Sequence, residues 1–328
     1  MLSATPMKSP APAFSVVVPV YNEDESLDEL VASIETAMAP LGGGHEIVFV
    51  DDGSTDGTLE TLKRLLRVHP QVRVFSFRSN LGKSPALTCG FQMASGDVVV
   101  TMDADLQDDP ANIQRMHEHL ARERVDVVTG WRRERRDGVL KILSSKLFNL
   151  IVVRALFGCS FNDMNSGLKI YKAEVARELQ LYGGMHRFIP LIAKEMGYRV
   201  AEIPVTHRAR KYGATKYHST KIFTELPDLL TIFFLIRYVR RPLHFFGSIG
   251  SALFTLGSVL LIYLTILWAR GITISGRPLL SFGVLLVLVG AQVVFTGLLA
   301  DLIVSVNQDR KQRFPLKYAS DRDAPPTG

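Results

Sequence analysis

A pair of carboxylates behind an apolar run is the clearest candidate for chemistry in this sequence. Asp103 and Asp105 follow Val-Val-Val-Thr-Met with one alanine between them, and Gln107 comes two residues later. Mg²⁺ and Mn²⁺ take oxygen ligands, often a few carboxylates together with the phosphates of a substrate. An Asp-x-Asp pair occurs in many loops, but at the end of a strand it indicates a metal site. We therefore expect Mg²⁺ or Mn²⁺ at Asp103 and Asp105, with the amide oxygen of Gln107 as a third ligand.

Acidic residues follow two other apolar runs in the same way. Asp51 and Asp52 come directly after the run 46–50, and Glu23 ends the turn that follows the run 14–20. Carboxylates in such turns can accept hydrogen bonds from ribose hydroxyls or from a base N–H. Acids cluster in single turns by chance, but three successive strand ends that all carry them point to one binding site.

Two common nucleotide motifs are not present. No Gly-x-Gly-x-x-Gly follows the first apolar run, which disfavours a Rossmann dinucleotide site. Gly82-Lys83-Ser84 has the form of the end of a P-loop, but Phe77 stands where that motif needs its first glycine. We therefore reject an ATPase reading of this segment.

The elements that would position these residues alternate between strands and helices. Apolar, β-branched runs predict strands, and Ser26-Leu-Asp-Glu29 and Asp109-Pro110 have the form of helix starts. This alternation predicts an α/β fold with a mostly parallel sheet flanked by helices, in which ligands lie beyond the carboxyl ends of the strands. Strands are expected at 14–20, 46–50, 72–77, 97–103, 125–129, 167–171 and 199–205, and helices at 26–38, after 57 to about 68, 84–94, 109–122 and 187–197.

The apolar residues are concentrated near the C-terminus. Leu243–Trp268 and Leu279–Val306 are each long enough for the roughly 20 apolar residues that a membrane span needs. Lys and Arg cluster at 237–241 and 310–317, whereas the loop 269–278 carries only Arg270 and Arg277. Because cationic flanks stay in the cytosol, we expect both ends of this pair of spans there.

The remaining composition limits the partners of the chain. Its formal net charge is +6, and two of its basic clusters flank apolar spans, so a membrane and a phosphate-rich substrate explain the charge better than nucleic acid does. Cys89 and Cys159 have no metal-ligand spacing. We expect no nucleic-acid partner, and self-association into a homo-oligomer is left open.

These patterns predict five parts of the chain. The stretch 223–240 suits a helix lying at the membrane surface, with a core helix of the globular domain as the alternative. The expected parts are a disordered leader at 1–13, a catalytic domain at 14–220, an interfacial juxtamembrane helix at 221–242, two transmembrane helices at 243–306 and a cytosolic tail at 307–328.

Three motifs together resemble the inverting glycosyltransferases of family 2, which have the GT-A fold. They are Val-Val-Pro-Val-Tyr-Asn-Glu, Val-Asp-Asp-Gly-Ser-Thr-Asp-Gly-Thr and Met-Asp-Ala-Asp-Leu-Gln-Asp. Asn80-Leu-Gly-Lys83, the segment 207–217 and the two C-terminal spans narrow the resemblance to the dolichyl- and undecaprenyl-phosphate sugar transferases, over about residues 14–306. The resemblance implies a multi-pass protein of the plasma or inner membrane with a cytosolic catalytic domain.

The resemblance also implies roles for particular residues. Asp103, Asp105 and Gln107 would hold the metal, and Asp105, Asp163 and Arg210 would be catalytic. Asp163 would lie near the sugar, either as a base or to orient a hydroxyl. The nucleotide-sugar, of GDP-mannose or UDP-hexose type, would be bound by Pro19, Tyr21, Glu23, Asp51, Asp52, Lys83, Asp103 and Arg132. The acceptor phosphate would be bound by Lys141, Ser145, Arg210 and Lys216, with 207–216 as an acceptor loop.

The implied reaction needs no strong base, because the nucleophile is a lipid phosphate oxygen that is already anionic. Cations and the metal would position two anions that repel each other, and in-line displacement would invert the anomeric carbon. One alternative is a family 2 transferase with another acceptor, although the Gln-x-x-Arg-Trp motif of processive synthases is absent. Another is a non-catalytic membrane scaffold with the same fold, against which the intact Asp103, Asp105 and Gln107 argue.

Overall fold

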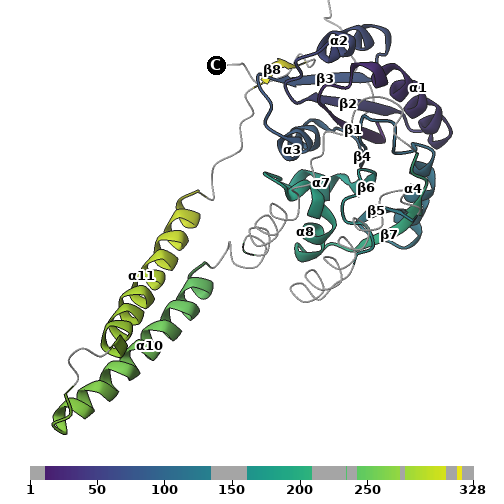
Figure 1. Ribbon diagram of the computed structural model, residues 1–328. Coiled ribbons are helices and arrows are strands. Elements are labelled where there is room, and N and C mark those ends of the chain that lie inside the picture. The colour runs from purple at the N-terminus through teal and green to yellow at the C-terminus, as the bar shows by residue number, and fades with distance from the viewer. Residues whose placement is uncertain are drawn as a thin grey trace, which may run out of the picture. The chain divides into compact units, whose positions relative to one another are not determined.

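The structure is a computed structural model that describes residues 12–133, 161–208, 234, 242–273, 278–307 and 316–319. The chain divides into two compact units (Figure 1). One comprises Met1–Lys221 together with Phe314–Gly328, and the other comprises Ile222–Arg313.

The first unit is built on a mixed sheet with the strand order β7-β5-β6-β4-β1-β2-β3-β8. The pairs β1–β2, β1–β4, β2–β3 and β5–β7 are parallel, whereas β6 and β8 run antiparallel to their neighbours. The strands are β1 Phe14–Val20, β2 His45–Asp51, β3 Val72–Phe77, β4 Val98–Thr101, β5 Val127–Arg132, β6 Lys169–Lys172, β7 Val200–Val205 and β8 Leu316–Ala319. The expected mostly parallel sheet is confirmed.

Helices cover both faces of this sheet (Figure 1). The helices of this unit are α1 Leu27–Met38, α2 Thr58–Val68, α3 Lys83–Met93, α4 Asn112–Arg122, α7 Ala173–Glu178 and α8 Ile189–Glu195, with short 3-10 turns at Asp24–Ser26, Ala39–Leu41 and Met185–Phe188. Because side chains alternate along a strand, Val16 and Val18 belong to the core formed with α1, α2 and α4, while Val17 meets α3 on the other face. At that contact α3 has Gly90, where a Cβ atom would collide with the Val17 side chain.

Two elements were missed by the sequence analysis. The helix α7 has six residues and lies directly after β6, too short for a helical period to be visible. The strand β8 follows the second apolar helix in the chain and pairs antiparallel with β3, with Ser76 opposite Tyr318. The tail, expected only as a cytosolic segment at 307–328, therefore contributes a strand to the sheet of the first unit.

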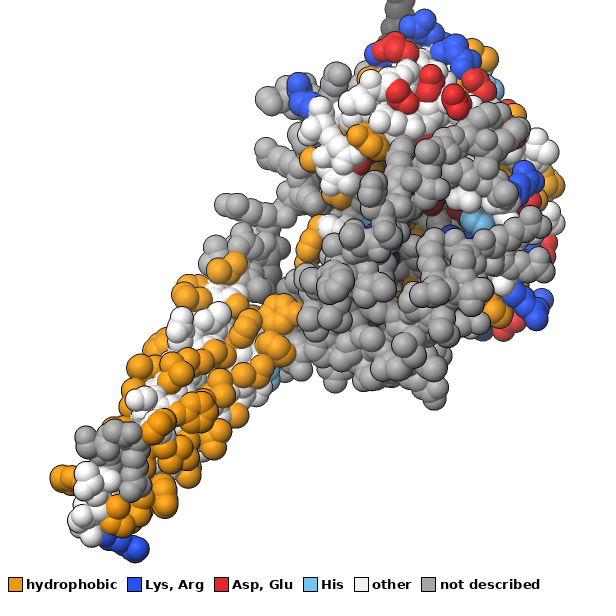
Figure 2. Space-filling model, in the orientation of Figure 1, with side chains coloured by type: hydrophobic (Ala, Val, Ile, Leu, Met, Phe, Trp, Pro, Cys, Tyr) orange, Lys and Arg blue, Asp and Glu red, His pale blue; other side chains and the backbone are white. Residues whose placement is uncertain are grey.

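The second unit contains two long apolar helices, α10 Pro242–Ala269 and α11 Pro278–Asn307. Both are long and apolar enough to cross a membrane, and Figure 2 shows hydrophobic side chains over their visible surface. Large side chains such as Phe295, 65% exposed, face outward. Of the expected interfacial helix at 221–242, only Phe234 and Pro242 are among the described residues.

Glycines allow α10 and α11 to touch along their backbones. A Cβ atom on Gly290 would lie 2.5 Å from the Phe254 nitrogen and 2.7 Å from the Gly250 carbonyl oxygen. Seven residues after Gly250 along α10, a Cβ atom on Gly257 would lie 2.9 Å from the Gly283 carbonyl oxygen. These glycines recur every seven residues, so they stay on one face of each helix and make a close antiparallel hairpin.

Candidate active site

The turns after β1 and β2 are fastened to each other at one edge of the sheet. The Asp52 amide donates to the Val20 carbonyl at 2.8 Å, and the Glu23 amide donates to the Thr58 hydroxyl at 3.0 Å. Asn22 adopts a left-handed backbone conformation with φ of 53°, and its side chain accepts the Thr55 amide at 2.9 Å. The Pro19–Glu23 turn and the loop after Asp51 therefore form one continuous wall, as expected for the carboxyl ends of parallel strands.

Asp51 and Asp52 shape this wall with their carboxylates. Asp51 accepts the Ser54 amide at 3.0 Å and the Ser76 hydroxyl at 2.7 Å. Asp52 accepts the amides of Leu81 and Gly82 at 2.7 and 2.9 Å, which fixes the loop directly before α3. Burial raises the pKa of Asp52 above its ordinary value, and the neighbouring charge of Asp51 adds to that, while the two amides act in the opposite direction.

Lys83, the first residue of α3, reaches the expected metal motif. Its ammonium lies 2.5 Å from Asp103 Oδ1. Burial alone would raise the pKa of Asp103, but the charges of Lys83, Lys169 and Arg132 outweigh it and hold this pKa below its usual range. The carboxylate is thus ionised, as an oxygen ligand of a divalent metal must be.

A second carboxylate, Asp108, supports the loop that carries this motif. Its Oδ2 accepts the Asp103 amide at 3.2 Å. Gly167 closes against both acids, because a Cβ atom there would lie 2.5 Å from Asp108 Oδ2 and 2.7 Å from the Asp103 carboxyl carbon. Any larger residue at position 167 would have to push these carboxylates apart.

The loop also has a strained turn and a buried imidazole nitrogen without a partner. Leu106 has φ of 61°, a left-handed conformation that costs a non-glycine residue about 1–3 kcal/mol, and such strain tends to occur at functional sites. His207 Nδ1 is buried without a hydrogen-bond partner, 3.8 Å from Asp108 Oδ1. The Asp105 carboxylate, largely buried, accepts the Gln107 amide at 3.2 Å.

These residues fit a divalent metal. Among the described residues no group of three His, Cys, Asp or Glu is close enough to hold an ion by itself. Asp103 and Asp105, with His207 Nδ1 beside the neighbouring Asp108, instead offer an incomplete set of ligands. Mg²⁺ and Mn²⁺ commonly complete such a set with substrate phosphates. The sequence analysis assigned His207 to the acceptor loop and did not anticipate its place beside this motif.

Arg132, at the end of β5, faces Asp163 in a bidentate ion pair. The Arg132 Nε lies 2.6 Å from Asp163 Oδ2, and its Nη2 lies 2.9 Å from Oδ1. Glu202 fixes the turn that carries Asp163, because its carboxylate accepts the amides of Asn162 and Asp163 at 2.7 and 3.0 Å. Both of these expected site residues are thus brought together, and Asp163 orients the guanidinium.

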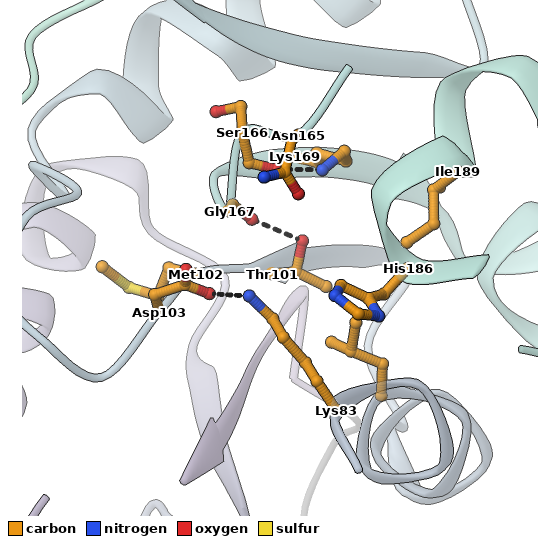
Figure 3. A pocket seen from close by; sticks show the side chains of 11 residues that line it. Lys83, Thr101, Met102, Asp103, Asn165, Ser166, Gly167, Lys169, His186 and Ile189 are labelled. Carbon is orange, nitrogen blue, oxygen red and sulfur yellow. Dashed lines mark hydrogen bonds and ion pairs between the residues drawn. The ribbon is translucent and has the colours of Figure 1, made fainter. Parts of the chain in front are cut away.

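Asp103 and Lys83 line a small cavity together with two polar residues, Lys169 and His186, that the sequence analysis missed (Figure 3). Lys169 on β6 is 3% exposed, donates to the Ser166 carbonyl oxygen, and has its pKa lowered to about 8 by burial and by the charge of Lys83. His186 faces the same cavity, and burial together with Lys83 lowers its pKa to about 3. No local pattern marks either residue, because their neighbours in the site are distant in sequence.

The remaining expected site residues lie outside the described part of the chain. These are the acceptor-phosphate residues Lys141, Ser145, Arg210 and Lys216. The acceptor loop is described only as far as Arg208, whose amide donates to the Gln107 carbonyl at 2.8 Å.

Comparisons with known proteins agree with this geometry. The profile described as glycosyl transferase family 2 matches residues 15–179. The chain is 38% identical to the dodecaprenyl-phosphate galacturonate synthase of Rhizobium johnstonii, over 88% of this chain and 87% of that protein. It is 33% identical to the undecaprenyl-phosphate 4-deoxy-4-formamido-L-arabinose transferase of Yersinia pestis, over 94% and 93%.

Solved structures share the fold. Glucosyl-3-phosphoglycerate synthase from Mycobacterium tuberculosis superposes with a TM-score of 0.51 at 21% identity, over 69% of this chain and 80% of that one. That likeness concerns the mixed sheet and its helices, whereas the profile and the nearly full-length relatives also match in sequence. On this evidence the chain belongs to glycosyl transferase family 2.

Proposed function

We propose that this chain transfers a sugar from a nucleotide-sugar to a polyprenyl phosphate at a membrane, with inversion of the anomeric carbon. The observation that carries the proposal is the extent of two matches. Relatives named for dodecaprenyl phosphate and undecaprenyl phosphate align over 88% and 94% of this chain, enough to include the carboxylate site and at least part of the apolar hairpin. Their names share the acceptor class and differ in the sugar.

The donor would bind along the wall formed by the turns after β1, β2 and β4. Asp103 and Asp105 would hold Mg²⁺ or Mn²⁺ on the diphosphate, with Gln107 and His207 as candidate further donors. The metal would neutralise the charge that builds on the leaving nucleotide. Lys83 is already within ion-pair distance of Asp103, so its ammonium would reach the same phosphates. Pro19, Tyr21, Glu23, Asp51 and Asp52 shape the nucleoside end of this wall.

Arg132 supplies a preorganised charge near the reacting centre. Asp163 accepts two of its guanidinium donors, which fixes the side chain before any substrate arrives. A fixed cation does not have to reorganise as charge develops, which makes it effective in stabilising a transition state. Because the acceptor phosphate is already anionic, these contacts support an orienting role for Asp163 in preference to that of a base.

Topology supports an acceptor that lies in a membrane. The two apolar helices are consecutive, and β8, which follows them, pairs with β3 in the same unit as the carboxylate site. Two spans return the chain to the side from which it started, so the catalytic unit and the tail strand would share one side. The cationic clusters at 237–241 and 310–317 indicate that this side is the cytosol.

An acceptor panel tests the proposal. The detergent-solubilised chain would be incubated with radiolabelled nucleotide-sugars and with undecaprenyl phosphate, a diphosphate-linked lipid sugar or no lipid. The proposal expects organic-soluble label only with undecaprenyl phosphate, and none from the Asp105→Asn variant. Label on the diphosphate-linked lipid would favour a different acceptor, and metal-independent or absent donor binding would favour a scaffold.

A further inference from the structure

The contacts of His186 assign the protonated nitrogen of its ring. The His186 amide donates to Ser84 Oγ at 3.0 Å, so this oxygen acts as an acceptor there. The same oxygen lies 3.0 Å from His186 Nδ1, and Nδ1 is the one acceptor that the described residues offer to the proton of this buried hydroxyl. Ser84 therefore donates to Nδ1, and the ring carries its own proton on Nε2.

The cavity that His186 lines is rich in hydrogen-bond donors (Figure 3). Lys83 and Lys169 contribute ammonium groups, and His186 contributes its Nε2–H. Lys169 uses one of its three donors on the Ser166 carbonyl oxygen. Thr101 donates its hydroxyl proton to the Gly167 carbonyl at 3.0 Å, so its oxygen is a neutral acceptor and adds no negative charge to the cavity.

One carboxylate balances the two ammonium groups in this lining. Asp103 pairs with Lys83 at 2.5 Å, and it is also the expected metal ligand. A metal held by Asp103 would add positive charge to the cavity wall. A ligand group that enters here therefore meets cations and N–H donors, and is most stable when it is an acceptor with negative charge.

We propose that this cavity receives the carboxylate of the donor sugar, and that His186 and Lys169 select a nucleotide-hexuronate over the matching neutral hexose. The inference rests on the proposed function, since it concerns the sugar of the same donor. A sugar amine would meet the two ammonium groups as a like charge, and a hydroxyl would leave donors without acceptors, which is costly in a buried site. Asp103 itself lines the cavity, so a hexose whose diphosphate is held at Asp103 would have its ring close to these donors.

Matched donor pairs that differ only at C6 test the proposal. We would measure Kd by calorimetry without lipid, in Mn²⁺, for UDP-glucuronate with UDP-glucose, UDP-galacturonate with UDP-galactose, and GDP-mannuronate with GDP-mannose. At least one acid should bind ten-fold or more tightly than its neutral partner. His186→Ala should bring that ratio to within about three-fold, while the Kd for free UDP or GDP stays within two-fold, since the diphosphate is assigned to Asp103, Asp105 and Lys83 and not to His186.

Two further variants keep the outcome clear. His186→Gln retains an N–H donor and should recover part of the preference, and Lys169→Met should lose it even where His186 is intact. Equal binding of acid and neutral sugars in all pairs, or a preference that His186→Ala leaves unchanged, would overturn the proposal. Because binding is measured without lipid, a chain that prefers the acid but transfers nothing to undecaprenyl phosphate would refute the proposed function and leave this inference standing.

Discussion

Arg132 and Asp163 form a bidentate ion pair at the centre of the site, with Nε and Oδ2 2.6 Å apart and Nη2 and Oδ1 2.9 Å apart. The Asp163 side chain is 2% exposed and that of Arg132 16%. Two charges so far from water are stable only as a pair. The pair is therefore a structural bond, and in the proposed reaction it would also fix a cation near the reacting atoms.

Removing one member of this pair should cost stability as well as turnover. Asp163→Ala leaves a buried guanidinium without its partner, which we expect to destabilise the chain by about 3–5 kcal/mol. The double variant Arg132→Met, Asp163→Leu should recover most of this loss but remain inactive. Thermal unfolding in detergent and turnover, measured side by side, check both parts. A stable, active Asp163→Ala variant would show that the pair has neither role.

The proposed metal site can be tested by comparing two acids that flank opposite ends of β4. Asp105→Asn removes a ligand charge beyond the carboxyl end of the strand, and it should abolish Mn²⁺-dependent binding of the nucleotide-sugar while the chain stays folded. Asp97 is an exposed acid directly before the same strand, so Asp97→Asn is a matched control that should bind normally. Calorimetry with and without EDTA measures both. Equal donor affinity of the Asp105→Asn variant in EDTA and in Mn²⁺, at the wild-type level, would remove the metal from the account.

The start of the proposed acceptor loop is bonded to residues 109–112, which follow the proposed metal motif. Arg208 pairs with Asp109 at 2.9 Å, and the side-chain Oδ1 of Asn112 accepts the Thr206 amide at 3.3 Å. Arg208→Ala should raise the KM for undecaprenyl phosphate several-fold and leave the Kd for the nucleotide-sugar unchanged. The reason is that the Arg208–Asp109 pair would position only the proposed acceptor loop. Arg122→Ala, which breaks an exposed pair with Glu123, is the control. A change confined to donor affinity would contradict this positioning role of Arg208.

Glu46 predicts a pH dependence of stability. Its carboxylate accepts the Ser95 amide at 2.7 Å and pairs with Arg73 at 2.5 Å. Burial opposes its charge, but these partners hold the pKa of Glu46 below its ordinary value. A lowered folded-state pKa contributes stability above the unfolded value of about 4.3 and loses it as the pH falls through the folded value.

Glu46→Gln should therefore destabilise the chain at pH 7 by about 1–3 kcal/mol, the cost of leaving buried donors poorly paired. The difference from wild type should shrink as the pH is lowered below about 4. Glu118→Gln, on the exposed face of α4, should show no such trend. Chemical denaturation at a series of pH values provides the measurement, and a pH-independent difference would exclude the charged contacts as its cause.

The glycine contacts of α10 and α11 predict a sharp difference between two small substitutions. Gly290→Ala places a Cβ atom 2.5 Å from the Phe254 nitrogen, so the helices must separate. Gly247→Ala meets only Leu243, at an ordinary 3.6 Å. The first variant should lower the thermal stability of the detergent-solubilised chain and the second should not. Equal behaviour of the two variants would argue against a backbone contact between the helices.

The sequence predicted the parts of the fold that repeat a local period. The runs at β1, β2 and β4 and the two apolar helices are visible as patterns of buried residues, and their ends place the carboxylates of Asp51, Asp52, Asp103 and Asp105 at one edge. Strand β8 was not visible, because a four-residue edge strand is held by main-chain hydrogen bonds that need no particular side chains.

The contacts that complete the site could not be read from spacing. Asp163 lies 31 residues from Arg132, and His186 lies 102 residues from Ser84, so only the folded sheet brings them together. Asp52 has contacts that its position did not predict. It was expected to contact the nucleoside because it stands at a strand end, and its carboxylate also accepts the two amides directly before α3.

The central claim is that the sugar alone, without its phosphate, moves to a lipid monophosphate. A donor labelled with tritium in the sugar and with radioactive phosphorus in the phosphate next to it tests this directly, with undecaprenyl phosphate and the purified chain in detergent. The account predicts a lipid product that contains the sugar label and lacks the phosphorus label, with release of the nucleoside diphosphate. Phosphorus label in the lipid, with release of the nucleoside monophosphate, would contradict it.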